Sequence, residues 1–383
     1  MVKILPSRRS QKIKSFIAMD ILDQVHQMRE AGEDVISLAI GEPDLPSPQE
    51  AKRACIEAIE KDFTQYTHSQ GLLELREAIV EYYFKRYRVK LHPEQVIVTS
   101  GSSPAFFLTF SSLLNPQDEV ILSDPHYPCY SNFIEFLEGR PVYVRVKEED
   151  QFQYRPEAVQ KKLSSKTKAI LINSPSNPTG YLIPDETIRA LAAFKPYLVS
   201  DEIYHGLVYD GQERSVLEFT DRAFVLNGFS KAFSMTGFRL GYVIAPKDFI
   251  RPMQKIQQNF YISVSSFSQK AGLAALKQAQ SSQLKLNQVF KKRRDLALRC
   301  LKKIGVEPAH LPEGAFYIFL NVKKYTRDSY RFAFDCLKKN KVGVTPGIDF
   351  GKGGEGYIRI SYATSEKNIR EGIRRLGNYL EGI

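Results

Sequence analysis

Seven short apolar runs between residues 96 and 246 limit the fold of this 383-residue chain more than any other feature. The runs are VIVTS (96–100), EVILSD (119–124), PVYVRV (141–146), KAILINS (168–174), YLVSDEIY (197–204), AFVLNGF (223–229) and GYVIAP (241–246). Several are continuous rather than alternating, which is typical of strands buried on both faces. Helical patterns at 104–114, 128–138 and 185–194 separate some of them, so we expect an α/β sheet that is mostly parallel. The short gap between the last two runs allows that pair to be antiparallel.

The length of the chain favours two domains rather than one. At 383 residues it exceeds the size at which single hydrophobic cores usually stop growing. We expect residues 47–280 to form a large domain around the seven-stranded sheet. Residues 1–46 and 281–383 would then combine into a smaller α+β domain built from both chain ends.

The two chain ends carry secondary-structure patterns of their own. From residue 13 to residue 28, apolar residues recur at helical spacing, namely Ile13, Ile17, Ile21, Val25 and Met28. The pattern stops at Ala31-Gly32, which is a helix stop signal. A long basic helical region is expected at about 266–304. It precedes three strands and a terminal helix, namely AFYIFLNV (315–322), KVGVTPG (341–347), YIRISYA (357–363) and the helix over 365–382.

The chain is basic, with a formal net charge of +11. Its densest cluster is Lys291, Lys292, Arg293 and Arg294, and this cluster lies in a helical pattern. Such a run indicates a solvated helix face more often than a nucleic-acid surface. No recognition helix or RNA-binding motif accompanies the charge, so we expect no nucleic-acid partner. A positive field also favours anionic ligands such as phosphates and carboxylates.

Cysteine usage and hydropathy predict a cytoplasmic protein. The four cysteines, Cys55, Cys129, Cys300 and Cys336, are far apart and have no metal-ligand spacing. We therefore expect reduced thiols and no metal site. No apolar run approaches the ~20 residues that span a bilayer, and MVKILPSRRSQK at the N-terminus lacks the apolar segment of a secretory signal. We expect no membrane partner.

The run GFSKAFSMTGFRLGY, residues 228–242, indicates the chemistry most clearly. Lys231 directly follows Ser230 and precedes Arg239, with small residues between them. A neutral lysine amine can condense with an aldehyde, whereas a hydroxyl and an arginine guanidinium suit a phosphate. An aldehyde and a phosphate on one small molecule describe pyridoxal 5'-phosphate (PLP). The run resembles the lysine signature of the class I/II aminotransferases, which are PLP-dependent enzymes of fold type I.

Further motifs follow predicted strands, where ligands gather in open α/β sheets. In VTSGSSPA, Ser102 and Ser103 lie between a strand and the start of a helix, a position that suits a phosphate. Asn177 lies in NSPSNPTG, which looks like the NPTG element of the same family. Asp201 falls within an apolar strand, where a carboxylate requires a partner. Arg359 lies between two isoleucines in another, and its planar guanidinium suits a carboxylate.

The resemblance extends from about residue 35 to residue 363 and implies roles for these residues. Lys231 would form a Schiff base with PLP, and Asp201 would bind its ring nitrogen. Asn177 and Tyr204 would lie at the phenolic oxygen, while Tyr127 would stack on the ring. The phosphate would be held by Ser102, Ser103, Ser230 and Arg239.

The resemblance also implies a substrate site and a dimer. Arg359 would hold the α-carboxylate of an amino-acid substrate, together with Asn177 and the backbone of Gly41. Tyr66 would reach the cofactor phosphate of the other subunit of a homodimer. The small-molecule partners implied are an amino acid and a 2-oxo acid.

The activity implied is transfer of an amino group from an L-amino acid to a 2-oxo acid by a ping-pong mechanism. Lys231 would serve as general base and acid, which requires a lowered pKa. Carbon–sulfur lysis or decarboxylation on the same fold is an alternative. A PLP-binding regulator without catalysis is a second alternative.

The side-chain preference of the enzyme stays open at this point. Ser103 stands where some aspartate-using relatives carry a lysine, so a dicarboxylate preference is in doubt. Arg8, Arg9 or Lys12 could supply a replacement charge if the N-terminal segment folds over the site.

Overall fold

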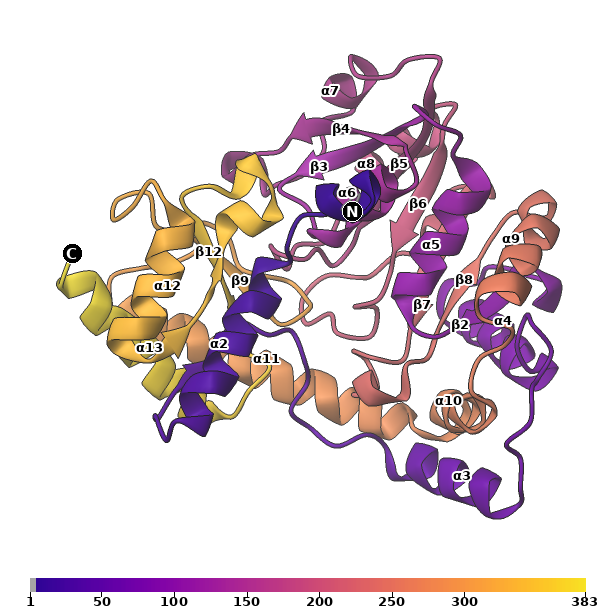
Figure 1. Cartoon of the computed structure of the whole chain (residues 1–383), viewed down its shortest axis with the longest axis horizontal. Helices are drawn as coiled ribbons and strands as arrows, with labels where there is room; N and C mark the ends of the chain where they lie inside the picture. Colours follow the sequence, from indigo (N-terminus) through magenta and orange to yellow (C-terminus); the bar gives the residue numbers. More distant parts are fainter. Residues whose placement is uncertain (1–4) are drawn as a thin grey trace, which may run out of the picture.

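A single seven-stranded sheet organises the middle of the chain (Figure 1). The computed structural model describes residues 5–383, so residues 1–4 of the predicted 1–46 segment lie outside the described residues. All seven predicted strands are present, in the order β2-β8-β7-β6-β5-β3-β4. Their bounds are β2 (Val96–Thr99), β3 (Glu119–Asp124), β4 (Arg140–Arg145), β5 (Thr167–Asn173), β6 (Tyr197–Asp201), β7 (Ala223–Gly228) and β8 (Gly241–Ile244).

Strand β8 is the one member of this sheet that runs against its neighbours. It pairs antiparallel with both β7 and β2, whereas β7, β6, β5, β3 and β4 are parallel. The expected antiparallel pairing of the last two runs is therefore confirmed. Because β8 is reversed, its amino end lies at the same edge of the sheet as the carboxyl ends of the other strands. Ligand-binding residues at that edge can therefore come from both sides of β8.

Helices cover both faces of the sheet, which explains why several of its strands are continuously apolar. Ile97 of β2 belongs to the hydrophobic cluster that includes residues of α5, α6 and α9, while Val96 and Val98 belong to the cluster on the opposite face that includes residues of α4, α8 and α10. The predicted helices at 104–114, 128–138 and 185–194 correspond to α5, α6 and α8. The helices around the sheet are α3 (Gln49–Glu60), α4 (Leu73–Tyr87), α5 (Ser102–Leu113), α6 (Cys129–Phe136), α7 (Pro156–Gln160), α8 (Asp185–Ala192), α9 (Lys247–Phe260) and α10 (Ser266–Gln278).

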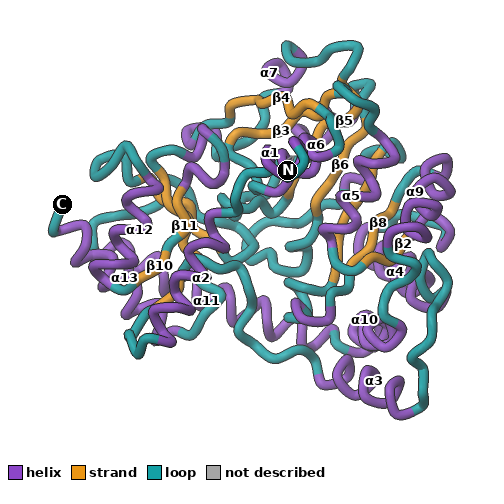
Figure 2. The backbone as a smooth tube through the Cα atoms, in the orientation of Figure 1, coloured by secondary structure: helices purple, strands orange, loops and turns teal. Residues whose placement is uncertain are grey.

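Both chain ends meet in a separate hydrophobic core, which lies on the left in Figure 2. Its strands form an antiparallel sheet, β11-β12-β9, and a parallel pair, β1-β10. The division at 47–280 stays a prediction. The elements are α1 (Arg8–Lys12), α2 (Ile17–Glu30), β1 (Ile36–Ser37), α11 (Gln280–Lys303), β9 (Tyr317–Asn321), α12 (Ser329–Asn340), β10 (Val342–Gly343), β11 (Thr345–Pro346), β12 (Tyr357–Ser361) and α13 (Glu366–Glu381).

Two helix predictions need correction. The first helical face does not extend to Ile13, because the chain leaves α1 at Lys12 and α2 begins at Ile17. Ile13 is consequently 47% exposed, whereas Ile21 and Val25 are buried in the core of the chain ends. The long basic helical region is two helices, because α10 and α11 are separated at Ala279.

The basic cluster is only partly a solvated face. Arg293 and Arg294 are buried, and both bind carboxylates that sequence inspection did not pair with them. Within residues 5–383, no helix is both long and apolar enough to cross a membrane. Nor do the described residues contain a group of three His, Cys, Asp or Glu side chains that could hold a metal ion.

Candidate active site

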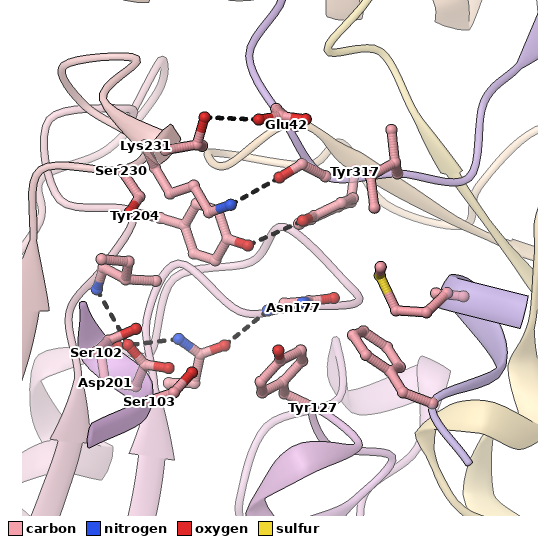
Figure 3. Close-up of a pocket in the computed structure, with 18 of the residues that line it drawn as sticks. Glu42, Ser102, Ser103, Tyr127, Asn177, Asp201, Tyr204, Ser230, Lys231 and Tyr317 are labelled. Atoms are coloured by element: carbon pink, nitrogen blue, oxygen red, sulfur yellow. Dashed lines mark hydrogen bonds between the residues drawn. The ribbon is translucent and has the colours of Figure 1, made fainter. Parts of the chain in front are cut away.

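A cavity of about 410 Å³ lies at the edge of the large sheet where the parallel strands end. It is bounded on its other side by the N-terminal part of α2 and by β12. Figure 3 shows the polar side chains that converge in it from these elements. The predicted site residues that line it are Gly41, Ser102, Ser103, Tyr127, Asn177, Asp201, Tyr204, Ser230, Lys231, Arg239 and Arg359. Tyr66 does not line the cavity and is 80% exposed in the single chain.

Lys231 follows strand β7 and extends its amine into the cavity (Figure 3). Its Nζ donates a 2.7 Å hydrogen bond to the backbone carbonyl of Gly41. Burial lowers the pKa of Lys231 to about 8, and the positive charges of Arg239 and Arg359 act in the same direction. Glu42 and Asp201 oppose that shift. About a tenth of the amine is therefore neutral, and so nucleophilic, at pH 7.

Asp201 is the last residue of β6 and is buried. Its carboxylate accepts a 2.5 Å hydrogen bond from the Tyr130 hydroxyl and a 3.2 Å hydrogen bond from the backbone N–H of Ile203. Both donors are neutral, and burial raises the pKa of Asp201 to about 6. A cationic N–H donor in the cavity would stabilise the ionised form of this carboxylate.

Gly101, Ser102 and Arg239 form a cradle for an anion. Strand β2 turns at Gly101, which has φ +92°, and α5 begins at Ser102. A Cβ atom at Gly101 would lie 2.5 Å from Nη2 of Arg239, so a side chain there would displace the guanidinium. Arg239 reaches this position because it lies two residues before β8, whose amino end lies at this edge. A helix N-terminus and a guanidinium together suit a phosphate.

Arg359 lies in β12 and is 2% exposed, yet its hydrogen bonds go to neutral groups. It donates to Oδ1 of Asn177 at 2.8 Å, to the carbonyl of Ala39 at 2.6 Å and to Oγ1 of Thr345 at 3.2 Å. Its Nε is buried and has no hydrogen-bond partner among the described residues. A buried guanidinium with spare donors and no carboxylate on it is suited to bind an anionic ligand.

The chain matches the family model for class I and II aminotransferases over residues 33–376. It belongs to that family. The (5-formylfuran-3-yl)methyl phosphate transaminase of Methanocaldococcus jannaschii is 41% identical over 98% of this chain and 99% of the relative. The aspartate aminotransferase of Pyrococcus horikoshii is 38% identical over 97% of this chain and 99% of the relative. The solved aspartate aminotransferase of Thermus thermophilus with maleate superposes with a TM-score of 0.94, at 35% identity, covering 98% and 100% of the two chains.

The protein is thus a PLP-dependent aminotransferase of fold type I, and its cavity fits that cofactor. The observations that test the fit are independent of the family match. A lysine amine with a lowered pKa, a buried carboxylate without a cation and an anion cradle face one cavity. These groups match the aldehyde, the ring nitrogen and the phosphate of PLP.

Several residues of the aminotransferase pocket escaped the sequence reading. Tyr130 binds Asp201, and Asn173 accepts a 2.7 Å hydrogen bond from the backbone N–H of Asn177. Tyr317 shares a 2.9 Å hydrogen bond with the Tyr204 hydroxyl, and its ring lies 4.2 Å from the guanidinium carbon of Arg359. Asn173 is the first residue of the quoted motif NSPSNPTG and could have been found there, whereas Tyr130 lies in the predicted helix over 128–138. Nothing in the sequence indicated that Tyr317 is a pocket residue, because the apolar run around it is typical of a core strand.

The N-terminal segment of the aminotransferase does fold over the site, but it does not bring a positive charge. Arg8, Arg9 and Lys12 line a separate hollow beside α6, where Arg9 pairs with Glu138 at 2.9 Å. The lining that the segment does supply is apolar and consists of Phe16, Ala18, Met19 and Leu22. The suggested replacement charge is therefore not in the cavity.

Proposed function

We propose that this aminotransferase moves an amino group between an L-amino acid and a 2-oxo acid, with Lys231 as the residue that joins PLP and moves the substrate proton. The observation that carries the proposal is the Lys231 amine, which has a pKa of about 8 and lies in one cavity with Asp201, Arg239 and Arg359. When bound, PLP supplies an aldehyde that condenses with amines and a ring that withdraws electrons from the substrate Cα.

The remaining residues would hold the cofactor in that cavity. Ser102, Ser103, Ser230 and Arg239 would bind the phosphate, because they surround the cradle at the start of α5. Asp201 would face the ring N–H, and Asn177 and Tyr204 would lie at the phenolic oxygen. Tyr127 would supply a flat face for stacking on the ring.

Arg359 would bind the α-carboxylate of the amino acid, since its spare Nε–H faces no protein acceptor among the described residues. Asn177 and the backbone of Gly41 border the same space. With the carboxylate fixed there, the neutral amine of Lys231 takes the proton from the substrate Cα. The resulting ammonium then returns a proton on the cofactor side, as a general acid.

We propose further that the enzyme is a cytoplasmic homodimer in which Tyr66 contacts the cofactor phosphate of the other subunit. Its exposed position outside its own cavity leaves it available to a second chain. Sedimentation gives the oligomeric state. Tyr66→Phe should weaken PLP binding only under conditions in which the chain is dimeric.

Borohydride reduction of the purified holoenzyme tests the central assignment. Proteolysis should then yield a pyridoxyl-modified peptide that contains Lys231. Lys231→Ala should still bind PLP but lose amino transfer. Modification of a different lysine, or normal turnover by the alanine variant, would refute the role of Lys231. An assay that compares ammonia release with oxo-acid formation separates amino transfer from lysis.

A further inference from the structure

The substrate side chain must lie in the part of the cavity that the cofactor and the α-carboxylate leave free. We propose that this part, formed by Phe16, Met19 and Leu22 opposite Phe133, selects an amino acid with an aromatic side chain and disfavours a second carboxylate. This inference rests on the function proposed above, because it uses the cofactor and carboxylate positions assigned there. It concerns the substrate class, which neither the family nor the fold fixes.

The cavity offers no free cation to a second carboxylate. Among the described residues that line it, the cations are Lys231, Arg239 and Arg359. Each has an assignment, to the cofactor aldehyde, the phosphate and the α-carboxylate. The acid at the mouth is Glu42, which accepts a 2.6 Å hydrogen bond from the hydroxyl of Thr236. A dicarboxylate would therefore bring a second negative charge toward Glu42 without an arginine or lysine of this chain to receive it.

The wall supplied by α2 is apolar, and part of it is exposed. Phe16, Met19 and Leu22 recur every three residues, so they lie along one side of the helix start. Met19 is 41% exposed even though it lines the cavity. In contrast, Ile21 and Val25 on the neighbouring side of α2 are buried in the core. Covering the exposed part of Met19 with a substrate ring would remove apolar surface from water.

Aromatic rings continue this wall toward the cofactor. The Phe16 ring meets the Tyr127 ring edge-on, at 5.7 Å between centroids and 89° between planes. Tyr127 is edge-on to Tyr130, and Phe106 connects Tyr130 with Phe133 at 5.1 and 5.8 Å. A substrate ring placed against these edges gains the same type of contact, which adds to the gain from burial.

The start of α2 is held in place by polar contacts on its far side. The Asp349 carboxylate accepts hydrogen bonds from the backbone N–H groups of Ile17 at 3.0 Å and Ala18 at 3.1 Å. Asn132 of α6 donates to the carbonyl of Lys14 and accepts from its N–H, at 3.2 and 3.3 Å. These contacts fix Phe16 and Met19 at the cavity before any substrate arrives, so the apolar wall belongs to the chain itself.

The test measures binding of two unreactive carboxylates to the holoenzyme by calorimetry. The probes are 3-phenylpropionate and succinate, which share one carboxylate and differ in the second group. We expect 3-phenylpropionate to bind at least about ten-fold more tightly. Phe16→Ala and Met19→Ala should each weaken it by roughly ten-fold and leave succinate unchanged. Met19→Arg should reverse the preference, because it adds the missing cation.

Ile13→Ala is the matched control, because Ile13 lies in the same segment and is 47% exposed but does not line the cavity. It should alter neither affinity. Equal or tighter binding of succinate by the unmodified enzyme would overturn the inference. So would an equal loss of both probes in Met19→Ala, since that result means a structural role alone.

Turnover separates this inference from the proposed function. Amino transfer from L-aspartate in preference to L-phenylalanine would overturn the aromatic subsite and leave the aminotransferase mechanism intact. Tight binding of 3-phenylpropionate without transfer from any amino donor would do the opposite.

Discussion

Helix α11 and the active site both bury arginines, and the hydrogen-bond partners of these arginines differ. In α11, Arg293 makes a two-point contact with Asp44 at 2.5 and 3.2 Å, and Arg294 binds Asp210 at 2.5 Å and Asp295 at 2.9 Å. In the active site, Arg359 is equally buried, but among residues 5–383 it contacts neutral acceptors alone and its Nε–H has no partner.

The difference lies in the group that pairs with each charge. Carboxylates of the same chain pair with the arginines of α11, so folding alone neutralises these positive charges. The charged groups at the bottom of the active site, Asp201 and Arg359, have neutral hydrogen-bond partners and stay incomplete until a ligand arrives. Burial of incomplete charge shifts pKa values and costs stability, which is a common signature of functional sites. Pairing with carboxylates therefore separates Arg293 and Arg294 from Arg359. Arg76 of α4 is also buried and donates to the carbonyls of Gly71 and Pro93, so the unused Nε–H, and not the neutral partners alone, sets Arg359 apart from the other buried arginines among the described residues.

Removal of Arg359, whose hydrogen bonds go to neutral groups, should have the largest effect on activity. Arg359→Leu should lower kcat/KM for an amino-acid donor by roughly a thousand-fold, because the α-carboxylate loses its buried partner. The melting temperature should change little, since an uncompensated buried cation disappears with the side chain. Steady-state kinetics and thermal unfolding give both values. A large loss of stability with unchanged kcat/KM would place Arg359 with the arginines of α11.

Removal of the Asp201 carboxylate should stabilise the cofactor-free protein and weaken its aminotransferase activity. Burial raises the pKa of Asp201 from 3.8 to about 6, so the folded chain binds this proton more tightly than the unfolded chain. Stability is therefore lost as the pH rises from about 4 to about 6, and the loss is complete above that window. Asp201→Asn should restore up to about 3 kcal/mol at pH 8 and almost nothing at pH 4. Urea unfolding of both proteins at the two pH values measures this, and an equal gain at both would contradict it.

Removal of Arg294, which pairs with carboxylates, should lower stability and leave activity nearly unchanged. Arg294→Met should lower the free energy of unfolding by about 2 kcal/mol, because Asp210 and the carbonyl of Pro312 lose a charged donor. The values of kcat and KM should stay within about two-fold of those of the unmodified enzyme, since Arg294 does not line the active-site cavity. A loss of activity without loss of stability would break the comparison.

The smallest effect concerns the charges around Lys231. Glu42 raises the pKa of Lys231, so Glu42→Gln should shift that pKa below about 8. Arg239 lowers it, so Arg239→Gln should shift the pKa upward. The pH dependence of Lys231 acetylation in the cofactor-free protein reports both shifts. Shifts of the same sign in the two variants would show that Lys231 does not respond to these charges.

Much of the fold followed from local patterns. All seven strands of the large sheet were predicted. In most of them burial on both faces produces a continuous apolar run, whereas the edge strand β4 is partly exposed. The helical region over 266–304 was predicted, but the break between α10 and α11 at Ala279 was not. Ile13 was misplaced for a similar reason, since periodicity alone does not show where the chain leaves a helix.

Several residues of the candidate site could also be predicted from the sequence. Asp201 and Arg359 stood out because a charge inside an apolar run requires an explanation, whereas Lys231 stood out because Ser230 precedes it and Arg239 follows it. Tyr317 and Met19 did not stand out, because an apolar or aromatic side chain looks the same in a core and in a pocket wall. Whether Arg8, Arg9 or Lys12 reached the cavity depended on the path between α1 and α2, which sequence periodicity does not describe.

The sequence by itself determined the order of strands and helices along the chain and the set of reactive side chains at the strand ends. Both are recorded in residues close together in sequence. Only the tertiary structure decided which charges are completed and which wait for a ligand. Arg294 and Asp210 lie 84 residues apart, and Arg293 and Asp44 lie 249 apart, so only folding brings each pair into contact. The same folding brings Arg359 to Asn177 across 182 residues and leaves its charge without a carboxylate.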